Sequence, residues 1–152
     1  IREVEGLFKL SFVEDPWGTK IEVVEDQEWL GFHHIHLRSD NPEKTLAWYE
    51  KLFGGVPDKL KGRLTGLRYN DGLWLLVGQQ RDGALVPTAG RSFDHLGWEV
   101  DDMDVFVAML QDKGIELDFG PREITNSAGQ ELIIAFVVSP EGVRIEIVEV
   151  VS

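Results

Sequence analysis

Apolar and polar residues alternate along several short stretches of this chain, the pattern of strands that bury one face. One pair of such stretches occupies about 7–13 and 19–24 and is joined by the turn DPWG. Another pair occupies about 131–138 and 143–150 and is joined by SPEG. In both, the turn glycine is followed by two residues and then by Ile-Glu. The chain therefore carries one hairpin pattern near its beginning and again near its end.

A second repeat is a strand that runs into a helix. HIHLRSD starts at His34 and HLGWEVD starts at His95, and the two align from the first histidine to the final aspartate. In the first copy the alternation places His34, His36 and Arg38 on one face. The opposite face is apolar, and we expect His33 to lie with it as a packing or rim residue. Each copy thus has a polar face that is free for chemistry.

Capping residues and glycines mark the two helices that follow. In the first copy Asn41 is expected to cap a helix from Pro42, which Gly54 and Gly55 end. In the second copy an aspartate precedes an apolar stripe at helical spacing, and a glycine ends it. The residues of this second helix are Asp101 or Asp102 as cap, Met103, Phe106, Val107 and Leu110 as stripe, and Gly114 as stop.

Further strands are expected after each helix. In the first copy they lie at about 63–69 and 73–79, joined by the turn NDG, and the second copy uses the closing hairpin at 131–150. Shorter strands are expected near 56–60 and 115–119. Each copy then reads β-α-β-β-β, so the predicted class is α+β with two βαβββ modules and an extra N-terminal β-hairpin. The expected boundaries are 1–30 for the hairpin and linker, 31–80 for the first module, 81–92 for a linker, and 93–152 for the second module.

Composition narrows the function. The net charge of −12 over 152 residues argues against nucleic acid or an anionic membrane as a partner. The absence of cysteine excludes disulfides, thiolate metal sites and cysteine nucleophiles. No apolar run approaches the roughly 18 residues of a membrane span. No signal-like segment is visible, so a cytoplasmic location is the expectation.

Histidines at matching places in two copies of a repeat point to a shared site. A lone strand histidine is most often a surface or satisfied core residue, but His34 and His95 both lie opposite the helix-packing face. Glu146 lies in the apolar strand VRIEIVEV, where a carboxylate is costly to bury unless it is paired or ligated. Alternatively, this strand has one solvated face and Glu146 points to water. If the three converge, they offer ligands for a divalent ion such as Fe²⁺, Mn²⁺, Zn²⁺, Co²⁺ or Ni²⁺.

Three separated motifs resemble one known superfamily. HHIHLRSDNPEKTLAWYEKLFGG, DHLGWEVDD and SPEGVRIEIVE are similar to the glyoxalase, bleomycin-resistance and extradiol-dioxygenase proteins, also called vicinal oxygen chelate proteins. The resemblance spans about residues 31–150 and implies two modules curved around one cleft. It also implies that His34, His95 and Glu146 are metal ligands. At the fourth ligand position of the four-ligand members this chain has Leu76, which departs from the pattern of lactoylglutathione lyases and epimerases.

The resemblance leaves two functions open. The first is a divalent-metal enzyme, similar to a dioxygenase, lyase or isomerase, that acts on a small molecule with neighbouring oxygens. In that enzyme His36 is the candidate general acid or base and Arg38 the candidate anion clamp, although solvent or sheet-rim positions explain both slightly better. The second is a metal-free protein that sequesters a small molecule, as bleomycin-resistance proteins do. Superfamily clefts form within one chain or in a homodimer, and we expect an intramolecular cleft because both first strands are present.

The N-terminal hairpin has no first strand or helix of its own. The simplest account is that the chain starts inside an earlier module of a longer protein. Glu22 follows Gly18 as Glu146 follows Gly142. We expect the hairpin to dock on a sheet edge of this chain or of a partner, with Glu22 solvated and outside the metal site. The alternative is that Glu22 fills the corner left by Leu76.

Overall fold

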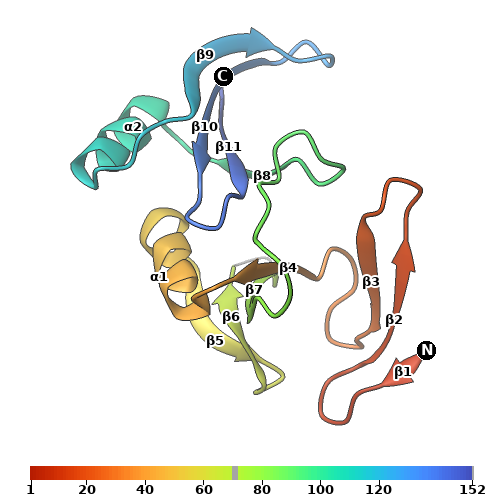
Figure 1. Ribbon diagram of the computed structural model, residues 1–152. Coiled ribbons are helices and arrows are strands. Elements are labelled where there is room, and N and C mark those ends of the chain that lie inside the picture. Colours follow the sequence, from red (N-terminus) through yellow and green to blue (C-terminus); the bar gives the residue numbers. More distant parts are fainter. Residues whose placement is uncertain (70–71, 152) are drawn as a thin grey trace. The chain divides into compact units, whose positions relative to one another are not determined.

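The computed structural model describes residues 1–69 and 72–151. The chain divides into two compact units, Ile1–Leu85 and Val86–Ser152, shown in Figure 1. Asn70 and Asp71, which belong to the expected NDG turn, lie outside the described residues.

The first unit contains the first predicted βαβββ module. Its sheet has the strand order β4-β7-β6-β5. The outer pair β4 and β7 is parallel, whereas β7 with β6 and β6 with β5 are antiparallel. The elements are β4 (His34–Ser39), α1 (Pro42–Phe53), β5 (Val56–Leu60), β6 (Leu64–Arg68) and β7 (Trp74–Gln79). α1 packs across β4, β6 and β7.

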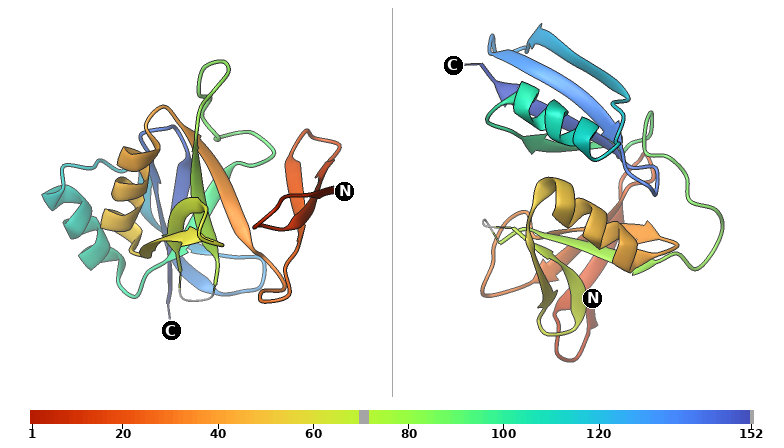
Figure 2. Two further views of the ribbon diagram at one scale, coloured as in Figure 1. Left: turned by 90° about the horizontal axis from the view of Figure 1, so that it is seen from below. Right: turned by 90° about the vertical axis from the view of Figure 1, so that its left-hand side faces the viewer.

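The second unit repeats the same topology. Its sheet has the order β8-β11-β10-β9, and β8 pairs with β11 in parallel. The elements are β8 (His95–Glu99), α2 (Met103–Asp112), β9 (Phe119–Thr125), β10 (Glu131–Val138) and β11 (Arg144–Val150). The right-hand view of Figure 2 shows α2 lying along this sheet. Two βαβββ modules, preceded by an N-terminal hairpin, are therefore confirmed.

Local signals at the helix ends are also confirmed. The side chain of Asn41 accepts a hydrogen bond from the Lys44 amide, and Gly54 closes α1 with a φ of 68°. Asp102, rather than Asp101, caps α2 by accepting from the Val105 amide. Both caps satisfy backbone donors that would otherwise be unpaired.

One expected strand is displaced. The second module was expected to place a short strand at 115–119, whereas β9 covers Phe119–Thr125. Gly120 and Pro121 suggest a break, but β9 is the edge strand of its sheet. Proline is tolerated there because an edge strand does not need every amide for pairing.

The N-terminal segment forms a separate sheet. The expected hairpin is present as β2 (Lys9–Glu14) and β3 (Lys20–Glu25), and the unexpected strand β1 (Arg2–Glu3) pairs with β2. In the described residues these strands pair only with one another, so the expectation that the hairpin docks on a sheet edge of this chain is wrong, and docking on a partner's edge stays a prediction. Figure 1 shows β2 and β3 on the side of the β4–β7 sheet opposite α1.

Side-chain packing explains why the hairpin sits on the face of the sheet. Phe8 is 5% exposed and forms a cluster with Leu60, Trp74 and Leu76, against which Val24 packs. Burying a phenylalanine stabilises a fold by about 1.5–3 kcal/mol. A two-stranded hairpin is marginal alone, so this apolar contact supplies the stability that its own ladder lacks.

Candidate metal centre in the first unit

Strand register brings His34 and His36 to the face that the hairpin covers. His34 is opposite Trp74 and His36 is opposite Leu76 in the parallel pair of β4 and β7. Trp74 and Leu76 belong to the cluster that contacts the hairpin. Because side chains alternate along a strand, His34 and His36 project toward the hairpin as well.

Glu22 reaches the same place from β3. It shares a hairpin face with Val24, since alternate residues of a strand lie on one side. Val24 packs on the apolar cluster, and Glu22 continues along that face to the histidines. One carboxylate oxygen of Glu22, Oε2, lies 3.4 Å from Nε2 of His34 and 3.4 Å from Nε2 of His36. The ligand atoms of the three residues all lie within 4.8 Å of one another, a spacing that suits a metal ion.

The expectation that Glu22 is solvated is wrong. Its side chain is 13% exposed, and its ion-pair partners are the two imidazoles. The sequence frame shared with Glu146 was the signal that singled out Glu22. What that frame cannot show is that the hairpin packs on the histidine-bearing face rather than at an edge.

His33 and Asp26 support His34 from behind, which sequence reasoning missed. Nδ1 of His33 lies 2.7 Å from Nδ1 of His34, and Nε2 of His33 lies 3.1 Å from Oδ2 of Asp26. A carboxylate can only accept, so His33 donates from Nε2. In neutral His33 the other nitrogen then accepts a hydrogen bond from Nδ1 of His34. This arrangement leaves the lone pair of His34 on Nε2, the atom that faces Glu22.

Burial and neighbouring groups lower the pKa values of His34 and His36. Burial, assisted by the neighbouring His33, lowers the pKa of His34 to about 4. Burial also lowers the pKa of His36, and the proximity of His34 adds to the effect, while Glu22 opposes it. Burial by itself raises the pKa of Asp26, but hydrogen bonds from the Glu28 amide, His33 and Lys61 outweigh it and lower the pKa. Neutral imidazole is the form that binds metals.

The second unit holds a histidine–glutamate pair of its own. His95 begins β8 and Glu146 lies on the neighbouring strand β11, with Nε2 and Oε2 3.4 Å apart. Nδ1 of His95 donates to Oδ1 of Asp94 at 2.7 Å, so the lone pair of a neutral His95 imidazole would again lie on Nε2. The hydrogen bond with His95, followed by that from the Gly90 amide, lowers the pKa of Asp94. Arg144 lies over the ring of Phe136, with Cζ 3.8 Å from its centroid.

His36, Arg38 and Leu76, which the sequence also singled out, differ in their exposure to solvent. The side chain of His36 is 41% exposed, which leaves it accessible to a proton donor or acceptor from solvent. Arg38 is exposed and lies beside Gly78 of β7. Leu76 is 2% exposed within the apolar cluster and is no ligand. His34 lies in one unit and His95 and Glu146 in the other, so their convergence stays a prediction.

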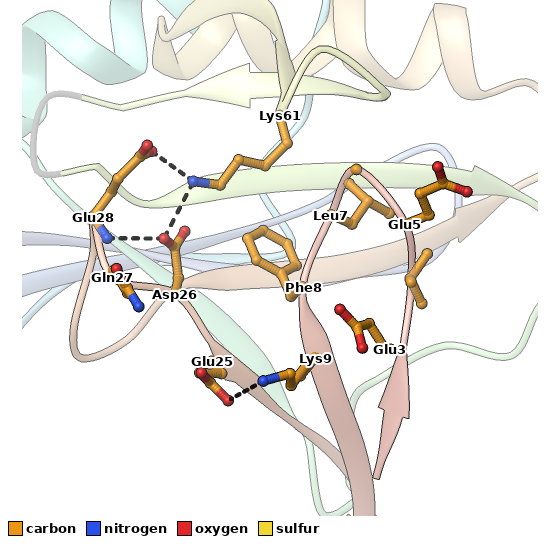
Figure 3. Close-up of a pocket in the computed structure, with 12 residues that line it drawn as sticks. Glu3, Glu5, Leu7, Phe8, Lys9, Glu25, Asp26, Gln27, Glu28 and Lys61 are labelled. Atoms are coloured by element: carbon orange, nitrogen blue, oxygen red, sulfur yellow. Dashed lines mark hydrogen bonds and ion pairs between the residues drawn. The ribbon is translucent and has the colours of Figure 1, made fainter.

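A separate pocket of about 620 Å³ lies behind Asp26. Figure 3 shows Lys61 reaching between Asp26 and Glu28, with Nζ 3.2 Å and 2.6 Å from their carboxylates. Glu22, His34 and His36 do not line this pocket. Among residues 1–69 and 72–151, the group of ligand atoms spaced to hold a metal is that of Glu22, His34 and His36, so we assign the candidate chemistry to the histidine cluster instead.

No helix in residues 1–69 and 72–151 combines the length and the apolar character that crossing a bilayer requires.

No curated protein sequence matches the chain significantly. Solved structures do. A virulence protein from Salmonella typhimurium is 21% identical with a TM-score of 0.63, and the match covers 81% of this chain and 98% of that one.

Two further structures carry functional names. A glyoxalase/dioxygenase from Nostoc punctiforme is 16% identical with a TM-score of 0.61 and covers 80% of this chain and 92% of its own. A lactoylglutathione lyase from Agrobacterium tumefaciens is 18% identical with a TM-score of 0.54 and covers 78% and 92%. At these identities the likeness concerns the fold. The family model described as Glyoxalase/Bleomycin resistance protein/Dioxygenase superfamily matches residues 31–147, and the chain therefore belongs to that superfamily.

Proposed function

We propose that this protein is a divalent-metal-dependent enzyme of the vicinal oxygen chelate type. Its substrate is a small molecule with two neighbouring oxygens. The observation that supports the proposal is that Nε2 of His34 and Nε2 of His95 each lie 3.4 Å from a carboxylate oxygen, of Glu22 and Glu146 respectively. Two imidazoles and one carboxylate, the donor types of His34, His95 and Glu146, suit a first-row divalent ion.

The proposed ligands are His34, His95 and Glu146, at the positions where the superfamily motifs match. Each of the two histidines has its Nδ1 engaged, by His33 in one case and Asp94 in the other. Such partners orient a metal-binding imidazole and raise the basicity of its free nitrogen. The bound metal would supply Lewis acidity toward substrate oxygens.

Two more residues are proposed to act on the substrate. His36 is proposed to hold or accept a proton at Nε2, because its side chain is partly exposed while its ring contacts that of His34, with centroids 4.7 Å apart. Arg38 is proposed to bind an anionic substrate group through its exposed guanidinium. Both lie on the strand that carries His34.

Metal analysis of protein purified anaerobically tests the proposal. We expect stoichiometric metal in the wild type and little in His34→Ala, with the fold preserved by circular dichroism. His36→Gln is expected to retain the metal and to lose turnover, since its proposed part is proton transfer. Wild-type protein that stays metal-free after incubation with Fe²⁺, Mn²⁺, Zn²⁺, Co²⁺ and Ni²⁺ would instead identify a metal-free binding protein.

A further inference from the structure

We infer that Glu22, donated by the N-terminal hairpin, is a metal ligand that replaces the carboxylate missing at Leu76. The inference rests on the proposed function and extends its ligand set beyond the matched family segment. The family model begins at residue 31, so the strand that carries Glu22 precedes it. Glu22 thus makes the hairpin part of the metal site of the first unit.

The residue of β7 that lies opposite His36 offers no ligand atom to a metal. Leu76 is opposite His36 on β7, and a leucine side chain has no donor atom. Leu76 is instead an anchor, because it packs with Phe8 of the hairpin segment. Leu76 therefore has no ligand atom of its own but helps to hold the hairpin that carries Glu22.

The distance between Glu22 and His34 matches the distance between two ligands of one ion. Ligand atoms bound at about 2.0–2.2 Å lie roughly 2.8–3.1 Å apart when the angle at the metal is octahedral and roughly 3.3–3.6 Å apart when it is tetrahedral. Oε2 of Glu22 is 3.4 Å from Nε2 of His34, which is long for a hydrogen bond to an imidazole. In the second unit the same spacing, 3.4 Å, separates Nε2 of His95 from Oε2 of Glu146.

The charge of Glu22 also calls for a cation. Its side chain is 13% exposed, and no lysine or arginine of residues 1–69 and 72–151 pairs with it. A nearly buried carboxylate is costly unless it is paired with a positive charge or bound to a metal. A divalent ion between Glu22 and Nε2 of His34 supplies that charge.

A second carboxylate changes the chemistry expected of the site. Two histidines and one carboxylate leave the open positions typical of iron oxygenases. With Glu22 added, one fewer position is open for substrate or O₂, and the net positive charge of the site falls. This donor set favours Lewis-acid chemistry on two neighbouring substrate oxygens over the binding of O₂ together with substrate.

Glu22→Gln in the full-length protein tests the inference, with Glu25→Gln as the matched control. Both residues lie on β3, but Glu25 is on the other face, 61% exposed, and pairs with Lys9. Titration calorimetry with Zn²⁺ should show weaker binding for Glu22→Gln by more than the roughly 10–100-fold that loss of an outer partner costs. Glu25→Gln should bind as the wild type does. In metal-free protein, Glu22→Gln should raise the unfolding temperature, because an uncompensated charge has been removed.

Two results would overturn the inference in different ways. If Glu22→Gln keeps wild-type affinity while Glu146→Gln loses it, Glu22 is not a ligand and the proposed function stands. If the wild type binds no Zn²⁺ or Co²⁺ at all, both the inference and the proposed function are wrong. Equal losses from Glu22→Gln and Glu146→Gln, with no loss from Glu25→Gln, support both.

Discussion

The two units contain the same pair of groups, built in different ways. In each, Nε2 of a histidine lies 3.4 Å from Oε2 of a glutamate. In the second unit, His95 and Glu146 stand on hydrogen-bonded neighbours, β8 and β11. In the first unit, His34 stands on β4, whereas Glu22 belongs to a different sheet that reaches it only through side-chain packing.

The same distance between a histidine nitrogen and a glutamate oxygen can therefore be held by interactions of different strength. A ladder of backbone hydrogen bonds determines which residue faces which, and a core substitution rarely shifts that register. A docked hairpin depends on the few apolar side chains beneath it. The pair of the first unit should therefore be sensitive to packing, and that of the second unit should not.

Phe8→Ala should have the largest effect and should break the first pair alone. Removing a buried phenylalanine costs about 3–5 kcal/mol, and Phe8 anchors the hairpin to Trp74 and Leu76. We expect faster amide hydrogen exchange in β2 and β3 and weaker metal binding. Exchange in β10 and β11 should not change.

Val23→Ala is the control for this prediction. Val23 lies on the other face of the hairpin and is 55% exposed, so its truncation should change stability by less than about 0.5 kcal/mol. If amide hydrogen exchange in β2 and β3 is the same in Phe8→Ala as in the wild type, docking of the hairpin does not depend on the apolar cluster.

His33→Phe tests whether the hydrogen bond from His34 to His33 orients the His34 imidazole for metal binding. Phenylalanine keeps a ring against Phe8, whose centroid lies 5.2 Å away, but it cannot accept the hydrogen bond from His34. Metal affinity should fall by about 10–100-fold, as is usual for a lost outer partner. Two-dimensional ¹H–¹⁵N spectra of the imidazoles in the metal-free wild type should show the proton of His34 on Nδ1.

Asp94→Asn is the corresponding change in the second unit. Asp94 is 32% exposed, whereas the side chain of His33 is 9% exposed, so water can take the place of the lost partner more easily. Its effect on affinity should be smaller than that of His33→Phe. A larger loss of metal affinity in Asp94→Asn than in His33→Phe would show that the partner of His95 matters more than the partner of His34.

The helix caps should give the smallest effects, and equal ones. Asn41→Ala and Asp102→Ala each remove a side-chain acceptor from the first turn of a helix, at equivalent places in the two modules. Each should lower the free energy of unfolding by about 1 kcal/mol in urea titrations. Metal affinity should stay unchanged, and a drop in either variant would show that the helix positions the ligands.

The sequence by itself determined the parts of this protein that local chemistry specifies. Asn41 and Gly54 set the limits of α1 because capping needs only neighbouring residues. The alternation around His34 and His95 identified the polar faces for the same reason. The strand β9 escaped this reasoning, because Pro121 is acceptable only at an edge position that pairing across the whole module establishes.

Only the tertiary structure decided what lies against those faces. Glu22 reaches His34 because Phe8 and Val24 pack onto Leu76, a contact between segments far apart in the chain. The same docking places Asp26 behind His33 and so orients His34. Such contacts arise from the apolar surface that the whole unit buries, and no local pattern of residues specifies which face a hairpin will cover.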